Sequence, residues 1–145
     1  EAELYDTARI VGSVFQNPRS QFFCVDTTSE LAFGCENMGM PEDEIFSRVD
    51  EAARELNIEK LLGRSIFELS GGEKQKISCA SVSALRPEVM VLDEPTSNLD
   101  VHAIEELKQT LLGWKAVCRN QPGLCLLHAD GRNHRPYMGL CSYIR

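Results

Sequence analysis

The chain has 145 residues, with 15 Lys and Arg against 22 Asp and Glu, so its formal net charge is −7. This length suits one domain with a hydrophobic core, and the 43% of apolar residues argues against disorder. The acidic balance argues against nucleic-acid binding through a basic face. No apolar run reaches the ~20 residues that a membrane-spanning helix needs, so we expect a soluble, intracellular protein.

The cysteines and the charge are distributed in an informative way. Six cysteines are too few for a disulfide scaffold and none forms a C-x-x-C pair, so we expect reduced thiols that fill the core. Residues 1–116 carry 11 basic and 21 acidic residues, a net charge of −10, whereas residues 117–145 carry four arginines and one aspartate, a net charge of +3. We therefore treat residues 117–145 as an atypical tail.

The first half of the chain predicts a strand followed by helices. Residues 10–15 form an apolar, β-branched run that predicts a strand, and a turn follows at residues 16–18. Residues 26–30 offer capping side chains in front of a short helix. Pro41 and the acids after it predict the first turn of an amphipathic helix. The apolar stripe of this helix comprises Ile45, Val49, Ala52 and Leu56.

The second half alternates helix and strand. Residues 69–75 open a helix that should continue to about Leu85, where the dipeptide Arg86-Pro87 stops it. Residues 89–92 are a continuous apolar run, which predicts a strand buried on both faces of a parallel sheet. Helical spacing then returns at Val101, Ile104, Leu107 and Leu111. This alternation predicts an α/β domain.

Two acids follow the buried strand directly. Ligands of open parallel sheets bind at the carboxyl ends of the strands, where Asp93 and Glu94 would lie. Neighbouring side chains of an extended chain point to opposite sides, so one acid could hold Mg²⁺ while the other orients and deprotonates a water molecule. The alternative, that the two acids only cap the next turn, weighs about equally on these residues alone.

The start of the helix at residues 69–75 offers a second candidate site. Ser70, Gly71 and Gly72 would leave backbone N–H groups free at the positive end of the helix dipole, which is a cradle for a phosphate. Taken alone, this tripeptide favours the alternative of an ordinary serine N-cap followed by flexible glycines.

The order of the segments decides between these alternatives. The chain carries VFQNP at residues 14–18, LSGGEKQ at 69–75, VMVLDE at 89–94 and PTSNLD at 95–100. In this order they resemble the nucleotide-binding subunit of ABC transporters, over residues 1 to about 115. The segment 14–18, with QFF at 21–23 and LAFG at 31–34, is similar to the energy-coupling-factor branch, whose ATPases drive the uptake of vitamins and transition metals.

The resemblance implies a fold and an organisation. The fold would be α/β, a partial P-loop NTPase (RecA-like) parallel sheet with an inserted helical subdomain. Residues 1–20 and 86–145 would form the partial catalytic core, and residues 21–85 the helical subdomain that ends in the signature helix.

The resemblance also implies roles for residues at the chain's own nucleotide. Gln16 would contact Mg²⁺ and the attacking water, and Asp93 would hold Mg²⁺. Glu94 would be the catalytic base. His128, which follows an apolar run, would be the histidine that polarises the γ-phosphate, although an ordinary histidine without that role is the alternative.

Other residues would serve a nucleotide held by an opposing subunit, because these ATPases enclose two nucleotides between two chains. Ser70, Gly71 and Gly72 would bind the γ-phosphate of that ATP, and Asp100 would communicate across the dimer. For Gln75, nucleotide contact and a place on a solvated helix face remain alternatives.

Two departures from the family pattern matter. The sequence holds no G-x-x-x-x-G-K-[ST] phosphate loop, which the family carries before the segment of Gln16. Because the chain also begins at Glu1, we expect it to be incomplete and unable to bind or hydrolyse ATP by itself. The tail at residues 117–145 does not resemble the family and would be either a divergent end or a reading-frame slip.

The sequence therefore predicts the ATPase subunit of an importer of the energy-coupling-factor type. Its cofactors would be ATP and Mg²⁺. Its partners would be a second ABC ATPase subunit and an integral membrane subunit, docked beside Gln16 and the helices of residues 26–57 at the cytoplasmic face of the membrane. The alternatives are an ABC ATPase that acts on ribosomes or DNA, and an inactive half-site that contributes only the signature motif.

Overall fold

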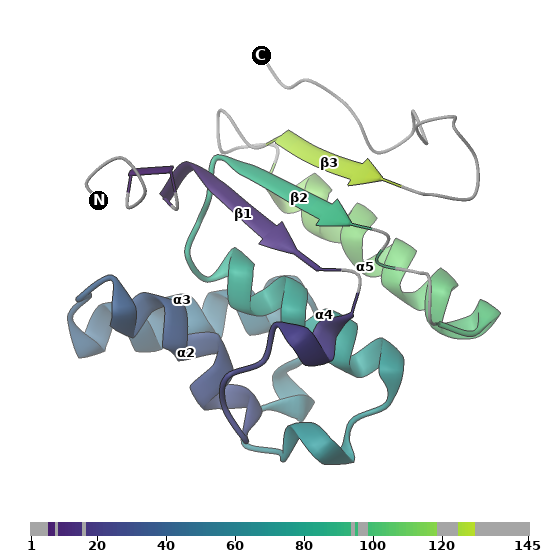
Figure 1. Ribbon diagram of the computed structural model, residues 1–145, viewed down its shortest axis with the longest axis horizontal. Coiled ribbons are helices and arrows are strands. Elements are labelled where there is room, and N and C mark those ends of the chain that lie inside the picture. The colour runs from purple at the N-terminus through teal and green to yellow at the C-terminus, as the bar shows by residue number, and fades with distance from the viewer. Residues whose placement is uncertain are drawn as a thin grey trace.

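The structure is a computed structural model that describes residues 6, 7, 9–15, 17–93, 95, 99–118 and 125–129. Within these residues, three parallel strands form one sheet in the order β1-β2-β3 (Figure 1). The strands are β1 (Val11–Val14), β2 (Val89–Asp93) and β3 (Cys125–Ala129). The helices are α2 (Thr27–Asn37), α3 (Glu42–Glu55), α4 (Gly71–Ser83) and α5 (Val101–Cys118), with the short 3-10 helices η1 (Pro18–Ser20), η2 (Glu59–Leu61) and η3 (Ile66–Glu68).

The predicted α/β architecture with a parallel sheet is confirmed. The described helices gather on one side of the sheet (Figure 1), and the strand side chains that face them are buried. In β2, Met90 and Leu92 are fully buried, whereas Val89 and Val91 are only half-buried. The prediction that β2 is buried on both faces is therefore wrong for one face, because the described helices cover only the other.

Helix starts follow the capping signals in the sequence. The Asp26 carboxylate accepts a hydrogen bond from the Ser29 N–H at 3.0 Å and so begins α2. Pro41 precedes α3, whose first turn is acidic as predicted. Helix α4 ends at Ser83, two residues before the predicted end, and its chain reverses at Arg86 in the left-handed region with φ 51°.

The predicted apolar stripes hold with one exception. On α3, Val49 and Ala52 are buried as expected, as is Leu56 directly after the helix. Ile45 of α3 and Ile104 of α5 are half-buried. On α5, Leu107 and Leu111 are buried, but Val101 is 85% exposed. Helix α5 begins at Val101, so this side chain lies at the open end of the helix, before its apolar face reaches the core.

Helix α4 joins the sheet to the other helices, because it contacts β1 as well as α2, α3 and α5. Its approach to β1 depends on Gly12, since a Cβ atom there would lie 2.3 Å from Val82 Cγ1. The division into residues 1–20 and 86–145 against 21–85 stays a prediction, since α4 packs on both sides of it.

Two further expectations can be compared with the described residues. Cys35 and Cys79 are free thiols buried in the core, as predicted, and burial raises the pKa of Cys79 to about 12. Across the described ranges, each helix is too short or too polar to cross a membrane.

Candidate nucleotide site

The first turn of α4 is held by a reciprocal pair of hydrogen bonds. The Glu73 N–H donates to Ser70 Oγ at 3.2 Å, and the Ser70 N–H donates to Glu73 Oε1 at 3.0 Å. Gly71 and Gly72 occupy the first two helical positions, where N–H groups have no acceptor inside the helix. Since Ser70 is exposed, its hydroxyl proton and these N–H groups can donate to an anion from solvent.

Glu73 stays ionised at this position. The N–H of Ser70 is the main cause that holds the pKa of Glu73 below its ordinary value, and the Ser70 hydroxyl and the charge of Arg64 add to it. An Arg64 guanidinium nitrogen lies 3.9 Å from Glu73 Oε2. The Glu73 carboxylate is therefore engaged by Ser70 and lies close to Arg64.

The glycines of this turn also have a packing role that the sequence reading missed. A Cβ atom at Gly72 would lie 3.1 Å from Ala103 Cβ, and one at Gly71 would lie 3.4 Å from Leu99 Cδ2. The start of α5 thus packs against the first turn of α4. Ala103 is the third residue of α5. A small residue near the start of each helix is the signal of this contact in the sequence, and it is weak.

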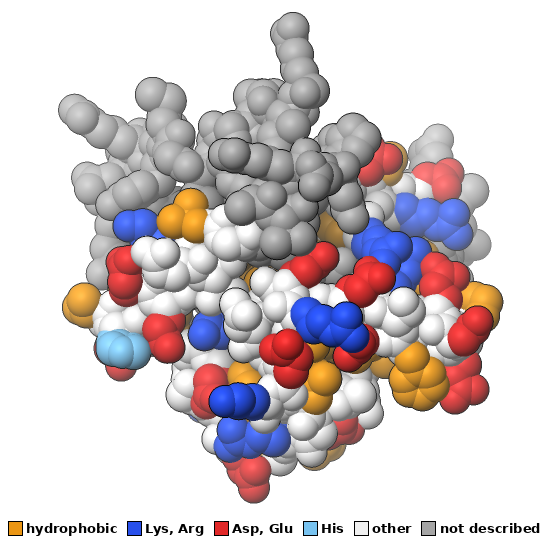
Figure 2. Space-filling view, turned by 180° about the vertical axis from the view of Figure 1, so that it is seen from behind, with side chains coloured by type: hydrophobic (Ala, Val, Ile, Leu, Met, Phe, Trp, Pro, Cys, Tyr) orange, Lys and Arg blue, Asp and Glu red, His pale blue; other side chains and the backbone are white. Residues whose placement is uncertain are grey.

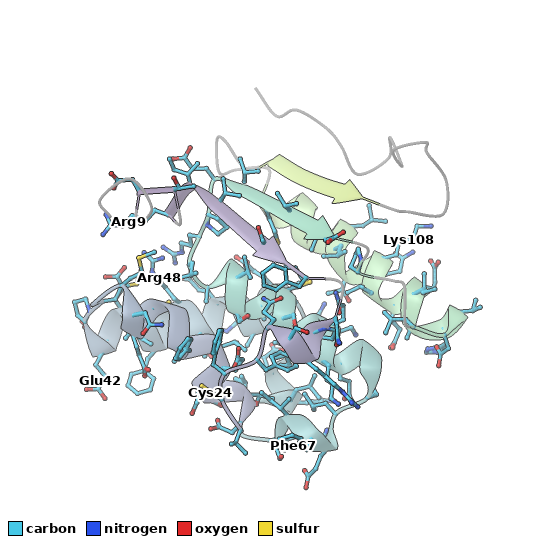
Figure 3. All side chains as sticks on the ribbon, in the orientation of Figure 1. Arg9, Cys24, Glu42, Arg48, Phe67 and Lys108 are labelled. Carbon is cyan, nitrogen blue, oxygen red and sulfur yellow. The ribbon has the colours of Figure 1, made fainter. Side chains whose placement is uncertain are left out.

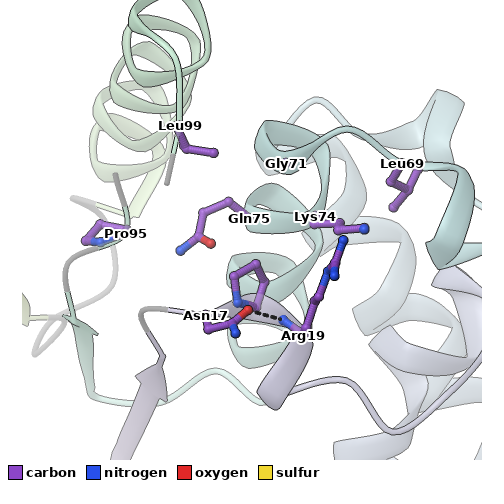
Figure 4. A pocket seen from close by; sticks show the side chains of 9 residues that line it. Asn17, Arg19, Leu69, Gly71, Lys74, Gln75, Pro95 and Leu99 are labelled. Atoms are coloured by element: carbon purple, nitrogen blue, oxygen red, sulfur yellow. Dashed lines mark hydrogen bonds between the residues drawn. The ribbon is translucent and has the colours of Figure 1, made fainter. Parts of the chain in front are cut away.

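A cavity of about 420 Å³ opens beside this turn (Figure 4). Its walls come from the segment after residue 16, from the first turns of α4 and from the segment after β2. The lining residues are Asn17, Pro18, Arg19, Leu69, Gly71, Lys74, Gln75, Pro95 and Leu99. Three of the four motif segments found in the sequence therefore meet at one cavity.

Gln75 is the buried polar side chain of this cavity. It is 1% exposed, and among the described residues its Nε2 has no hydrogen-bond partner. The alternative of a solvated helix face for Gln75 is thus wrong, because the segments of Asn17 and Pro95 close over this face of α4 (Figure 4). With the cations Arg19 and Lys74 in the same wall, the cavity is rich in donors and suits an anionic ligand.

The tip of β2 carries the second part of the candidate site. Asp93 is the last residue of β2 and is exposed. In the register of the parallel strands, His128 pairs with Leu92 and Ala129 with Asp93, so the backbone of His128 lies at the same edge of the sheet. Gln16 and Glu94 lie outside the described residues, as does the side chain of His128.

Asp100 has a local structural role. Its Oδ1 accepts a hydrogen bond from the Ala103 N–H at 2.8 Å, which caps the start of α5. The sequence analysis assigned Asp100 to communication across a dimer and did not find this cap.

The metal ligands among the described residues fit a Mg²⁺ ion that is bound together with a nucleotide, rather than an ion held by protein side chains alone. Among the described residues, no three His, Cys, Asp or Glu side chains cluster around a common point. One carboxylate, that of Asp93, stands at the tip of β2. Mg²⁺ is usually held by one or two carboxylates, with phosphate oxygens and waters as its other ligands.

Comparison with known proteins identifies the family. Residues 2–97 match the family model described as ABC transporter. The chain belongs to the ABC transporter family. The similarity to the ABC ATPases that the sequence analysis stated is thereby confirmed.

The relatives of this ABC protein include named subunits. A putative ABC transporter ATP-binding protein of Treponema denticola is 53% identical over 111 residues, which are 77% of this chain and 23% of that protein. The energy-coupling factor transporter ATP-binding protein EcfA1 of Bacillus licheniformis is 41% identical over 111 residues, 77% of this chain and 40% of that protein. The chain therefore spans less than half the length of these relatives.

A solved structure has the same fold. The structure of cbiO1 from Clostridium perfringens, described as part of the ABC transporter complex cbiONQ, superposes with a TM-score of 0.80 at 30% identity. The match covers 97% of this chain and 54% of that chain. The predicted fold, a P-loop NTPase parallel sheet with a helical insert, is confirmed by this match.

Proposed function

We propose that this ABC protein is the ATP-binding and ATP-hydrolysing subunit of an importer of the energy-coupling-factor type, which couples hydrolysis to solute uptake across a membrane. One observation carries the proposal: the segment after residue 16, the signature helix and the segment after β2 line one donor-rich cavity. Relatives named as EcfA1 at about 41% identity support the choice of branch.

At the chain's own nucleotide, the residues at the end of β2 would do the chemistry. Asp93 would hold Mg²⁺, which when bound neutralises charge on the phosphate oxygens. Gln16 would orient the attacking water, and Glu94 would accept its proton as the water oxygen attacks the γ-phosphorus in line with the departing ADP. His128 would donate a hydrogen bond to a γ-phosphate oxygen.

At the opposing subunit's nucleotide, the first turn of α4 would supply donors. The Ser70 hydroxyl and the N–H groups of Gly71 and Gly72 would donate to the γ-phosphate, with the helix dipole behind them. Gln75 would donate a hydrogen bond from its unpartnered Nε2 to the nucleotide or to the opposing subunit. Asp100 would lie at the contact between the two subunits. Because these donors are fixed by the capping box, they need little reorganisation on binding.

A membrane subunit would dock on the apolar surface beside this site. Phe23 is 73% exposed and stacks on Phe33 with ring centroids 4.9 Å apart. Val25 and Phe67 are 65% and 79% exposed, and the Val25 carbonyl accepts from the Ile66 N–H at 2.8 Å, which holds the two segments together. Figure 3 labels Cys24 and Phe67, which lie on these two segments. Exposed apolar residues gathered in this way are typical of a protein contact.

The described part of one face of the molecule gives no support to a partner made of nucleic acid. On the described part of the face in Figure 2, Lys and Arg side chains alternate with Asp and Glu side chains instead of forming a basic stripe. This pattern favours the importer over an ABC ATPase that acts on ribosomes or DNA.

The proposal is tested with the full-length product of the gene that contains this sequence. We expect saturable, Mg²⁺-dependent ATP hydrolysis that Glu94→Gln abolishes, and co-purification with a small integral membrane protein. The 145-residue chain, which lacks a phosphate loop, should be inactive beside it. Absence of hydrolysis in the full-length protein, or recovery of ribosomes in place of a membrane protein, would contradict the proposal.

A further inference from the structure

The cavity of Figure 4 brings together two cations from distant segments. Arg19 belongs to η1 and Lys74 to α4, and the Arg19 side chain extends toward Lys74 in the picture. The cations that form ion pairs in the described ranges are Arg48, Arg54, Arg64, Arg86, His102 and Lys108. Arg19 and Lys74 are not among them, and the described lining of the cavity includes no Asp or Glu.

The carboxylate next to Lys74 in the sequence is engaged elsewhere. Glu73 Oε1 accepts from the Ser70 N–H at 3.0 Å, and Glu73 Oε2 lies 3.9 Å from an Arg64 guanidinium nitrogen. Lys74 is half-buried, so water screens its charge only in part. Because an anion between Arg19 and Lys74 would relieve their repulsion, the pair indicates an anion site.

Two amide groups in the same lining offer uncharged donors. Gln75 is 1% exposed, and its Nε2 has no hydrogen-bond partner among the described residues. Asn17 Oδ1 accepts from the Arg19 N–H at 3.1 Å (Figure 4), which orients this amide group and leaves its Nδ2 as a donor. A buried donor without a partner is costly, so the Gln75 Nε2 points to a ligand independently of the two cations.

The charge and the donors of the cavity match a phosphate ion. A phosphate group carries more than one negative charge at neutral pH and has several strong acceptor oxygens. An arginine guanidinium binds such a group with two parallel hydrogen bonds, and a lysine ammonium adds a second charge. Leu69 and Leu99 in the lining keep the surroundings apolar, which strengthens both contacts. A carboxylate ligand would balance only one of the two cations.

The cavity adjoins the turn that would bind the γ-phosphate of the opposing subunit's ATP. Gly71 is the first residue of α4, and it belongs both to that turn and to the lining of the cavity. Gln75 lies on the same face one turn later, since residues four apart on a helix are neighbours. A phosphate ion that leaves the turn therefore lies next to the donors of the cavity.

We propose that the cavity between Arg19 and Lys74 binds a free phosphate ion and receives the orthophosphate that ATP hydrolysis releases. Binding of the ion follows from the residues of the cavity alone. Its source rests on the proposed function, in which the γ-phosphate lies at the Ser70-Gly71-Gly72 turn until water attacks it. While ATP is intact, Gln75 serves the nucleotide or the opposing subunit, and after hydrolysis its amide donates to the freed ion.

The test measures whether orthophosphate protects Lys74 against acetylation. Full-length protein is held with saturating Mg²⁺ and ADP, which occupy the nucleotide site, and the acetylation rate of each lysine is followed by peptide mass spectrometry. Lys60, an exposed lysine of η2 outside the cavity, is the internal control. We expect orthophosphate to slow acetylation of Lys74 roughly fivefold with a midpoint of about 1 mM, and to leave Lys60 unchanged. Acetate at the same ionic strength should protect neither lysine.

Two substitutions connect this protection to the cavity. Arg19→Gln removes a charge at an exposed position and should raise the midpoint about tenfold, because a hydrogen bond from a charged group is lost. Gln75→Met removes the buried donor and should raise the midpoint roughly fivefold. The matched controls, Arg9→Gln and Gln109→Met, lie at exposed positions outside the cavity and should stay within about twofold of wild type.

A second measurement tests the source of the ion. Orthophosphate should inhibit steady-state ATP hydrolysis by the full-length protein, and Arg19→Gln should raise its inhibition constant about tenfold, in step with the midpoint of protection. Arg9→Gln should leave this inhibition constant unchanged.

The outcomes separate the inference from the proposed function. If wild-type protein hydrolyses ATP but orthophosphate does not protect Lys74, or acetate protects it equally, the inference is wrong and the proposed function stands. If orthophosphate protects Lys74 but Arg19→Gln leaves its inhibition constant unchanged, the released ion does not occupy this cavity, and the inference is also wrong. If wild-type protein does not hydrolyse ATP, the proposed function fails, whereas protection of Lys74 would still support the phosphate site.

Discussion

Ser70 and Glu73 exchange two hydrogen bonds across the first turn of α4, each accepting on its side chain from the backbone N–H of the other. The arrangement uses the Ser70 oxygen as an acceptor for the Glu73 N–H. It also fixes the direction in which the N–H groups of Gly71 and Gly72 point. The signature turn is therefore organised before any ligand arrives.

The cap makes a direct prediction for stability. Ser70→Ala removes the acceptor for the Glu73 N–H and should lower the free energy of unfolding by about 1 kcal/mol, whereas Ser70→Gly should lower it by only a few tenths. Urea unfolding followed by circular dichroism measures both. Ser20→Ala, at an exposed position of η1, is the control and should have no measurable effect. Equal losses at Ser70 and Ser20 would contradict the capping role.

The same cap predicts a dependence on pH. The folded pKa of Glu73 is depressed, so its ionised form contributes stability above the ordinary carboxylate pKa, and this contribution is lost as the pH falls through the folded pKa. The difference in unfolding free energy between wild type and Glu73→Gln should be constant near neutral pH and shrink below about pH 4.5. Asp26 has a lowered pKa as well, through Ser29, but it is present in both proteins and cancels in the difference.

Gly12 is predicted to be required for the packing of α4 on β1. In Gly12→Ala the new Cβ would meet Val82 Cγ1 at 2.3 Å and Pro87 Cγ at 3.0 Å, so the helix or the strand must shift. Overpacking of this kind costs about 1–3 kcal/mol. The double variant Gly12→Ala with Val82→Ala should recover part of the loss, because it removes the nearer clashing atom.

A double-mutant cycle of urea unfolding measures this coupling. Gly113→Ala is the matched control, since a Cβ atom there would meet nothing within 4 Å. An additive result for residues 12 and 82 would show that the close approach does not determine the stability.

The features that the sequence predicts well are local ones. The cap at Asp26 and the stripe of Val49, Ala52 and Leu56 depend on residues within one helix, and both are confirmed. The features it misses depend on contacts between distant segments. The bond from Gln21 to Ser78 joins residues 57 apart, and no periodicity in the chain marks it.

The candidate site divides in the same way. The order of the motif segments predicted the family, and the Ser70-Gly71-Gly72 turn begins α4 as expected. The burial of Gln75 was not predictable, because it depends on how the segments of Asn17 and Pro95 fold over α4. The roles of Gln16 and Glu94 stay predictions, since both residues lie outside the described ranges.

A comparison of two buried glutamines tests whether the Gln75 amide lacks a hydrogen-bond partner in the free protein. Gln21 has hydrogen-bond partners on both atoms of its amide group, whereas Gln75 Nε2 has none among the described residues. Loss of a satisfied pair of bonds is destabilising, but loss of a buried, unpartnered donor relieves a desolvation penalty of about 1–3 kcal/mol. Gln75→Met should therefore lower the free energy of unfolding by about 1–2 kcal/mol less than Gln21→Met does.

The measurement is urea unfolding of both variants without nucleotide, repeated for the full-length protein with ATP in the Glu94→Gln background. With ATP the difference should narrow or reverse, because the Gln75 amide then gains a partner that methionine cannot replace. A larger loss in Gln75→Met than in Gln21→Met without nucleotide would mean that the Gln75 amide is already satisfied in the free protein. The donor would then be unavailable to a ligand, and the cavity would have to bind its anion through Arg19, Lys74 and the first turn of α4 alone.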